Sequence, residues 1–318
     1  MKAKTLNFIS RQKLLIVLIL VLVIASCVSE YFFTYTNMVN LFTQVSAYGI
    51  VACGMLFVVI SGEFDISVGS VMCFTSTAAV ALMNMADWGW ALALVAVLGI
   101  GIGVGCIYGF LVIKLNISSF IATLAGSIFY RGLAYLITGD GKPLKPELDF
   151  YSKIASTKVL KIPTIVYFFL VCVLLTYLIL KYTRFGRNIY ATGCNYEVAR
   201  FTGIHVVFYK TASFVVCSYF AVLAGILYSS RQNSANPSVA TDAGLTALSA
   251  VVLGGASLSG GKGTADGMFI GVMILGLLTN ALNMMGIDTY IQQVLKGALL
   301  IIFVCMERYS HNRRMDMI

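Results

Sequence analysis

Residues 258–263 read LSGGKG, and these glycines beside a lysine raise the question of whether the chain binds nucleotide phosphates. A phosphate-binding loop follows the pattern G-x-x-x-x-G-K-[ST], in which the lysine reaches the phosphates and the Ser or Thr reaches magnesium. Counting back from Lys262, Ala256 stands at the first glycine position, and Gly263 stands where the Ser or Thr belongs. Because the pattern fails at two defining positions, nucleotide binding is not predicted here.

The composition is that of a membrane protein. Hydrophobic residues make up 59% of the 318 residues, charged residues make up 11%, and the mean hydropathy is +0.90. A soluble domain usually has about 25% charged residues. An ATPase would also need a soluble α/β core of about 200 residues, and no stretch of this chain has such a composition.

Residue types that hold metals or act as nucleophiles are not grouped. No two of the eight cysteines have a C-x-x-C spacing, and most lie in apolar runs, where cysteine acts as a small hydrophobic residue. His205 and His311 lie in polar stretches without a second ligand nearby. We therefore expect no catalytic residue and no metal site.

Ten apolar segments have the length of a membrane helix, since about 20 apolar residues cross a bilayer. The predicted fold is an all-α polytopic membrane protein that forms one domain, residues 1–318. The predicted helices are 14–33, 41–60, 66–85, 90–113, 117–137, 163–181, 210–230, 244–258, 266–285 and 290–306. The eighth is short, which favours a discontinuous or re-entrant helix that is either buried in protein or beside a watery cavity.

Basic residues predict the orientation. They cluster at both ends of the chain and around residues 181–210, where five stand against the single acid Glu197. Because lysine and arginine are enriched in cytoplasmic loops, both termini and the loop 183–209 are predicted to be cytoplasmic. An even number of helices must then separate these cytoplasmic segments. Six helices are predicted before the loop and four after it, which agrees with this orientation. Residues 138–162 are then external.

The glycine-rich stretch fits a tight turn between the eighth and ninth predicted helices. Glycine allows positive φ angles and close backbone contact, and the glycines of this structural turn are Gly254, Gly255, Gly260, Gly261 and Gly263. Asp266 falls in the first turn of the next helix, where a carboxylate is favoured by the helix dipole. Elsewhere, Gly101, Gly105 and Gly109 repeat every four residues, which favours close packing of helices.

Four segments together resemble the permease subunits of bacterial ABC importers for ribose, galactose and related monosaccharides. They are residues 61–72 (SGEFDISVGSVM), 118–136 (SSFIATLAGSIFYRGLAYL), 183–204 (TRFGRNIYATGCNYEVARFTGI) and 248–286 (LSAVVLGGASLSGGKGTADGMFIGVMILGLLTNALNMMG). They follow the order of the family over most of the chain. Ser118, Glu63, Gly244 and Thr246 depart from the residues usual in the family, and these departures leave the substrate open.

The resemblance implies that the loop 183–209 couples this chain to a separate ATPase. In the family, a short helix in this loop meets the ATPase subunit. Asn195 can cap the N-terminus of such a helix. The residues matched to the contact region are Arg184, Gly186, Arg187, Asn188, Gly193, Asn195, Ala199 and Gly203. An ordinary cytoplasmic loop would explain the two arginines but not the run of small and amide residues.

A further set of polar residues is predicted to line the substrate pathway. Carboxylates near membrane depth, such as Glu63 and Asp65, are usually functional or paired. The predicted pathway residues are Asp65, Ser67, Gly69, Ser70, Thr123, Asn280 and Asn283. For Asp65 the alternative is a helix cap at an interface, and whether Glu63 and Asp65 line the path stays open. Lys296 and Arg131 are expected to snorkel to an interface.

These patterns and the resemblance predict the transmembrane subunit of an ATP-driven importer in the bacterial inner (plasma) membrane. By alternating access it would move a neutral, ribose-type monosaccharide, since few charges fall within the predicted helices. The chain itself is expected to be no enzyme and to hold no cofactor, with ATP and Mg bound by the partner ATPase.

The other expected partners are membrane lipid, a periplasmic or lipid-anchored sugar-binding protein, and a second permease subunit, identical or related. No nucleic-acid partner is expected. The alternatives are a stand-alone ion-coupled secondary transporter, which would have charge pairs inside its helices, and a membrane enzyme, which would have clustered His, Asp or Glu.

Overall fold

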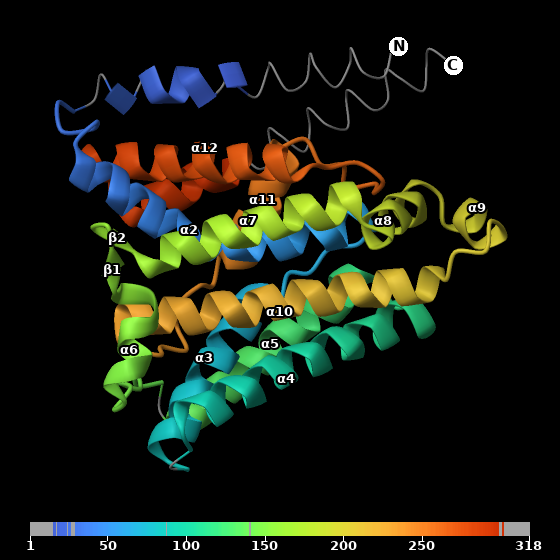
Figure 1. Ribbon diagram of the computed structural model, residues 1–318, viewed down its shortest axis with the longest axis horizontal. Helices are drawn as coiled ribbons and strands as arrows, with labels where there is room; N and C mark the ends of the chain where they lie inside the picture. Colours follow the sequence, from blue (N-terminus) through green and yellow to red (C-terminus); the bar gives the residue numbers. More distant parts are fainter. Residues whose placement is uncertain are drawn as a thin grey trace.

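The computed structural model describes residues 15–16, 18–23, 25–26, 29–86, 88–139, 141–298 and 301. Helices dominate this part of the chain (Figure 1): α2 (Tyr35–Ile60), α3 (Val68–Asn84), α4 (Trp90–Gly109), the π-helix η1 (Phe110–Lys114), α5 (Ser119–Thr138), α6 (Asp149–Ser156), α7 (Thr164–Tyr182), α8 (Arg184–Cys194), α9 (Tyr196–Phe201), α10 (Val206–Gln232), α11 (Ala243–Leu253) and α12 (Ala265–Met284). Residues 289–298 are also helical. The strands β1 (Lys158–Val159) and β2 (Ile162–Pro163) form an antiparallel hairpin.

Six helical segments are long and apolar enough to cross a membrane: α2, α4 with η1, α5, α7, α10 and α12. The apolar helices α3 and α11 are shorter, with 17 and 11 residues. Together these elements coincide with eight of the ten predicted helices, and the eighth is short, as predicted. The predicted helices 14–33 and 290–306 lie partly outside the described residues, as do the basic termini, so the count of ten and the orientation stay predictions.

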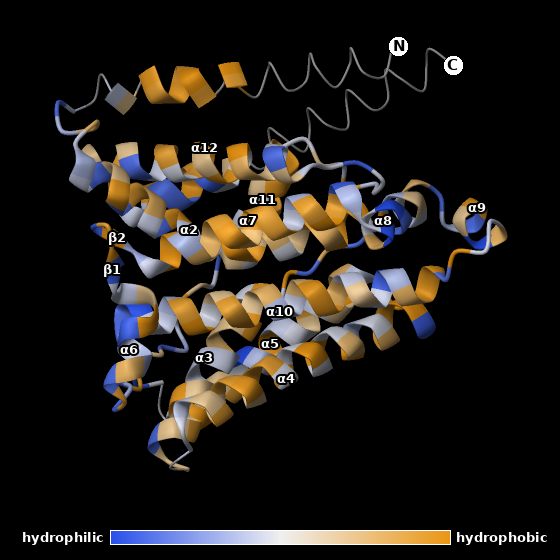
Figure 2. Ribbon diagram, viewed as in Figure 1, coloured by the Kyte–Doolittle hydropathy of each residue, from blue (hydrophilic) through white to orange (hydrophobic). Residues whose placement is uncertain are grey.

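The helices α2 and α10 lie at the centre of the bundle (Figure 1). The α10 helix packs against α4, α3 and α2, and α2 packs in turn against α7, α11 and α12. Most residues of α2 are buried, whereas most residues of α4, α5 and α7 are at least partly exposed. These outer helices are largely apolar (Figure 2), as a surface in contact with lipid chains must be. At one end of the bundle lie α6 and the hairpin, and at the other lie α8 and α9 (Figure 1).

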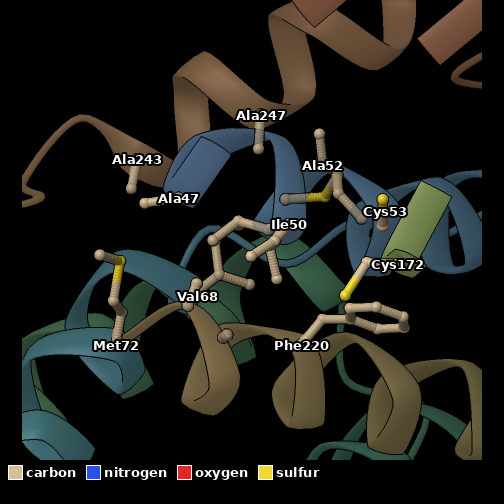
Figure 3. Packing of buried hydrophobic residues seen from close by; sticks show 14 of the residues in the cluster. Ala47, Ile50, Ala52, Cys53, Val68, Met72, Cys172, Phe220, Ala243 and Ala247 are labelled. Carbon is tan, nitrogen blue, oxygen red and sulfur yellow. The ribbon is translucent and has the colours of Figure 1, made fainter. Parts of the chain in front are cut away.

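Small residues set the spacing between the central helices. Gly101, Gly105 and Gly109 of α4 all face α10, and a Cβ atom at Gly105 would collide with the backbone of Val215. The close packing predicted from their spacing is confirmed. On the other side of α2, Ala47 lies beside Ala243 of α11 (Figure 3), and both are fully buried. Short side chains let these backbones approach, and many van der Waals contacts then stabilise the bundle.

The helices α3 and α11 begin at a common point inside the bundle. The carbonyl oxygen of Ala240, just before α11, lies against Gly69 in the first turn of α3. Reciprocally, the carbonyl oxygen of Ile66, just before α3, lies against Gly244 in the first turn of α11. Only glycine leaves room for these contacts. The eighth predicted segment was expected to be discontinuous or re-entrant, and α3, the third predicted segment, begins at the same point.

Candidate coupling interface and transport cavity

The loop after α7 folds into two short helices rather than one. The Thr183 hydroxyl accepts a hydrogen bond from the Gly186 N–H at 3.1 Å and caps α8. The Asn195 side chain accepts from the Val198 N–H at 3.1 Å and caps α9, as predicted. Beyond α9, Gly203 has a φ of +82°, which ends the helix and turns the chain into α10. The N-terminal ends of α8 and α9 are therefore both fixed by local capping hydrogen bonds.

The exposed surface of α9 includes two apolar side chains beside the charged Glu197 and Arg200. Phe201 is 85% exposed and Val198 is 57% exposed, while Ala199 is buried and faces the rest of the protein. Exposed apolar side chains on a projecting helix are typical of a surface that binds a partner. The sequence analysis did not single out Phe201 or Val198, although their position on either side of Ala199 was a usable signal.

The eight residues predicted for coupling divide into two groups in the structure. Arg184, Arg187, Asn195 and Gly203 are exposed, whereas the remaining four are at least partly buried. Asn188 donates a hydrogen bond to the Tyr209 hydroxyl at 2.6 Å and so ties α8 to α10. The geometry brings the eight residues together on α8 and α9, and their contact with an ATPase stays a prediction.

The glycine-rich turn packs directly against α8. The Gly261 N–H donates to the carbonyl of Ile60 at 2.8 Å, and the Tyr190 hydroxyl of α8 donates to the carbonyl of Gly263 at 2.7 Å. Burial raises the pKa of Tyr190 to about 12, so its hydroxyl stays a donor at neutral pH. Positive φ angles occur at four of the predicted turn glycines, Gly255, Gly260, Gly261 and Gly263. The fifth, Gly254, has an ordinary φ and packs against the backbone of Gly267.

An ion pair joins the same region to the segment between α2 and α3. The Lys210 ammonium on α10 lies 2.7 Å from the Glu63 carboxylate, and the two side chains are 13% and 17% exposed. The ammonium also lies 5.7 Å from the centre of the Tyr196 ring on α9. The contacts of Lys210 with Tyr196 and Glu63 therefore link the projecting helix α9 to the segment that leads into α3.

The buried carboxylate of Asp65 organises the start of α3. One oxygen accepts from the Ser67 N–H at 2.8 Å and from the Ser67 hydroxyl at 2.6 Å. The Thr123 hydroxyl of α5 accepts from the Ile66 N–H at 3.2 Å and holds the same segment. These contacts describe a cap for the segment, and they place none of these side chains in an open cavity.

Asparagine at position 65 is expected to leave the free energy of unfolding nearly unchanged, because it keeps the acceptor oxygen. Leucine at position 65 leaves the Ser67 donors unpaired and is expected to cost about 1–3 kcal/mol. Thermal unfolding of the purified variants in detergent measures both effects. If Asp65→Asn instead keeps full stability but abolishes transport, the carboxylate acts on substrate rather than as a cap.

A polar cavity of about 290 Å³ lies among α2, α11, α12 and the helical residues 289–298. Its side chains include four amides, three threonines, a tyrosine and two opposite charges, and the polar lining is Gln44, Tyr48, Asp242, Thr246, Thr279, Asn283, Thr289, Gln292, Gln293 and Lys296. Lys296 lies 3.8 Å from Asp242. Gln292 donates to Asn283 at 2.7 Å. Such a lining offers both donors and acceptors to a hydroxyl-rich solute.

The Asp242–Lys296 pair is shared with a second cavity of about 290 Å³, which extends along α11 past Leu245 and Ser249. Thr246 hydrogen-bonds the Asp242 carboxylate at 3.4 Å and also borders both cavities. The ion pair therefore borders both cavities. Asp242 is the residue immediately before α11, at the point where α3 and α11 begin.

Of the predicted pathway residues, Asn283 alone lines the first of these cavities. Asn280 instead exchanges hydrogen bonds with Asn37 of α2 at 3.0 and 3.1 Å. Ser70 accepts from Arg131 at 3.3 Å. That Asp65, Ser67, Gly69, Ser70, Thr123 and Asn280 line a path stays a prediction, and in this structure they hold helices together.

Two charged side chains of the helices have partners within the protein, and their position at an interface stays a prediction. The Arg131 guanidinium donates to the carbonyls of Pro237 and Val239 at 2.7 and 3.1 Å and braces the segment before α11. Lys296 pairs with Asp242. The partners of these charges come from distant segments of the chain. Among the described residues, no group of three His, Cys, Asp or Glu could hold a metal ion.

Comparison with known proteins places these features in context. The family model for the permease component of branched-chain amino acid transport systems matches residues 37–304. The chain is similar to the ribose import permease protein RbsC of Haemophilus influenzae, at 35% identity over 99% of this chain and 100% of that protein. It is also similar to RbsC of Escherichia coli K12, at 35% identity over 95% of each chain.

A third relative is the L-arabinose transport system permease protein AraH of Escherichia coli K12, at 37% identity over 89% of this chain and 86% of that protein. No solved structure matches significantly. The similarity to the Haemophilus influenzae protein extends over nearly the whole bundle.

Proposed function

This chain belongs to the permease-component family that matches residues 37–304, and from that premise we propose that it is the membrane subunit of an ATP-driven importer for a neutral, ribose-type monosaccharide. Members of this family are transport subunits, so the chain is not itself an enzyme, and it is a multi-pass protein of the bacterial inner membrane. ATP and Mg would be bound by a separate ATPase chain. A second permease subunit and a sugar-binding protein would complete the importer.

The observation that carries the proposal is the similarity, over nearly the full length, to permeases named for ribose and arabinose import. Both named sugars are neutral pentoses, whose hydroxyl groups donate and accept hydrogen bonds. The cavity of about 290 Å³ beside α11 and α12 is lined by side chains of both kinds. A bound pentose is smaller than this space, so the cavity suits a sugar that passes through rather than one held tightly.

The proposed coupling surface is α9 with the exposed part of α8. Val198 and Phe201 would enter a cleft on the ATPase, and Arg184 and Arg187 would lie at the rim of the contact. Buried members of the predicted set, such as Gly186 and Ala199, would hold the two helices in place rather than touch the partner.

Movement of α9 would reach the transport cavity through two connected contacts. One is the path from Tyr196 through Lys210 to Glu63, which ends at the segment leading into α3. The other is the packing of α8 on the glycine-rich turn, which lies between α11 and α12. Because α3 and α11 start at the same point, both contacts act on the residues around Asp242. Alternating access would follow from a shift of α3 and α11.

The Asp242–Lys296 pair is proposed to separate the two cavities until substrate passes. Asparagine at position 242 is expected to lower uptake at subsaturating sugar by up to about fivefold, because it removes the charge that pairs with Lys296, and a partly exposed ion pair is worth at most about 1 kcal/mol. The pair is about one-third exposed and 3.8 Å apart, so its loss should change the free energy of unfolding by less than about 1 kcal/mol.

Initial uptake rates across a range of sugar concentrations, together with thermal unfolding, measure the effect of Asp242→Asn. Lys153→Met is the matched control, because it breaks an exposed lysine–aspartate pair far from both cavities. Equal uptake by Asp242→Asn and the unmodified protein at low sugar concentration would exclude this role for Asp242.

Uptake into proteoliposomes tests the proposed function. The vesicles contain this protein with its ATPase, and the sugar-binding protein is added with ribose, arabinose, galactose or glucose. Uptake of one sugar that requires ATP supports the proposal and identifies the substrate. Uptake that requires only a proton or sodium gradient, without the ATPase, would replace it with an ion-coupled transporter.

A further inference from the structure

A basic cavity of about 540 Å³ lies at the end of the bundle opposite α8 and α9, where the β1–β2 hairpin meets α2 and α7 (Figure 1). Three cationic side chains line it, Lys158 and Lys161 from the hairpin and Arg231 from the last turn of α10. The described residues of its lining include no acid; the neutral polar ones include Asn40 and Thr43 of α2. This cavity is separate from the two that share Asp242.

The cations of this cavity lack partners within the described part of the chain. Arg231 is only partly exposed, yet its guanidinium makes no hydrogen bond or ion pair there, and neither does the ammonium of Lys158 or Lys161. A partly buried guanidinium normally has a partner, because removing it from water is costly. The three charges therefore form a site that is complementary to carboxylates or phosphates.

The hairpin holds one of its two lysines, Lys161, in an unfavourable backbone conformation. Leu160 and Lys161 form the two-residue turn with φ of +50° and +66°, where Asn-Gly is the usual sequence. The hydroxyl of Tyr35 donates to the Leu160 carbonyl at 3.3 Å, and that of Tyr167 donates to the Val159 carbonyl at 3.0 Å. Two anchors thus keep a strained turn in place, with Lys161 at the cavity.

We propose that this basic cavity is a docking site for an acidic segment of the soluble sugar-binding partner. The inference rests on the proposed function, which places α8 and α9 in the cytoplasm and this end of the bundle outside. A soluble partner is favoured over a lipid headgroup because α2 and α10, which form two of the walls, are the central helices rather than lipid-facing ones. The volume admits several carboxylate side chains.

Binding of the sugar-binding partner to this protein in phosphatidylcholine nanodiscs tests the proposal, with a hexaglutamate peptide as a second probe. Replacing all three cations with glutamine is expected to weaken both interactions by about tenfold or more and to flatten their dependence on salt. The control Lys145→Gln with Lys153→Gln changes two exposed lysines outside the cavity at the same end of the bundle and should leave binding unchanged.

A second variant separates docking from folding. Leu160→Asn with Lys161→Gly gives the turn its preferred sequence and should not lower the unfolding temperature, while it removes one cation of the cavity. Weaker docking at equal or higher stability supports the proposal. Unchanged docking of the triple variant overturns it, as does a loss of docking that appears only in phosphatidylglycerol discs, since that result would assign the cavity to lipid.

The outcome also separates this inference from the proposed function. Lack of ATP-dependent uptake by the unmodified protein would contradict the importer, but hexaglutamate binding needs no transport and would still be measured. Normal uptake with docking insensitive to the three cations would contradict the docking site alone.

Discussion

Methionine in place of Lys210 is expected to reduce ATP-dependent uptake by at least about tenfold and to lower the thermal stability of the protein. The variant leaves the Glu63 carboxylate, which is only 17% exposed, without the ammonium that lies 2.7 Å away. Breaking a buried pair typically costs about 3–5 kcal/mol, and partial exposure reduces this to about 2 kcal/mol. The larger effect on transport follows because Lys210 also contacts Tyr196 of α9.

Uptake and thermal unfolding of Lys210→Met are compared with those of Lys153→Met, whose exposed pair with Asp149 is 4.0 Å long. The control should behave as the unmodified protein. Exchanging the two charges, Glu63→Lys with Lys210→Glu, should recover part of the lost stability. Full uptake by Lys210→Met would show that no signal passes through this pair.

Alanine in place of Gly193 is expected to produce the second large loss of transport. A Cβ atom there would collide with the carbonyl of Ile60 and the N–H of Gly261, which are hydrogen-bonded to each other at 2.8 Å. The added methyl group would separate α8 from the glycine-rich turn. Overpacking of this kind costs about 1–3 kcal/mol, and uptake should fall by about tenfold or more because the contact between coupling helices and turn is lost.

Gly99→Ala is the matched control, because a Cβ atom at this helical position of α4 meets no atom within 4 Å. Alanine there should leave uptake unchanged and raise stability by up to about 1 kcal/mol. Co-purification of the ATPase with each variant, measured beside uptake, shows whether Gly193→Ala acts on assembly or on transmission. Equal uptake by Gly193→Ala and Gly99→Ala would contradict the packing described for α8.

Features that depend on nearby residues could be predicted from the sequence. Apolar segments predict helices because backbone groups in lipid must be hydrogen-bonded within the segment. The cap at Asn195 depends on an N–H three residues away, and the glycine turn depends on its own φ angles. The structure has eight of the ten predicted helices, the cap at Asn195 and positive φ angles at four of the five turn glycines. Hydropathy does not show at which level inside the bundle a helix begins, however. The short length of α3 and its common starting point with α11 were therefore missed.

Long-range pairs could not be predicted. Glu63 and Lys210 are 147 positions apart, and nothing in their local sequences indicates the contact. Arg131 looked like an interfacial residue, yet two carbonyls from a segment more than one hundred positions away bind it. The polar cavity was missed for the same reason, since Asp242 and Lys296 meet only once α11 and the helical residues 289–298 are packed together.

The central claim, ATP-driven import coupled through α9, is tested most directly by sugar uptake into proteoliposomes with Val198→Asp and Phe201→Asp. Both side chains are exposed, at 57% and 85%, so the double variant should fold with unchanged stability. The account predicts that the unmodified protein imports the sugar only with the ATPase and ATP, and that the variant loses about nine-tenths or more of this uptake and no longer binds the ATPase. Undiminished ATP-dependent uptake by the variant, or uptake without any ATPase, would contradict it.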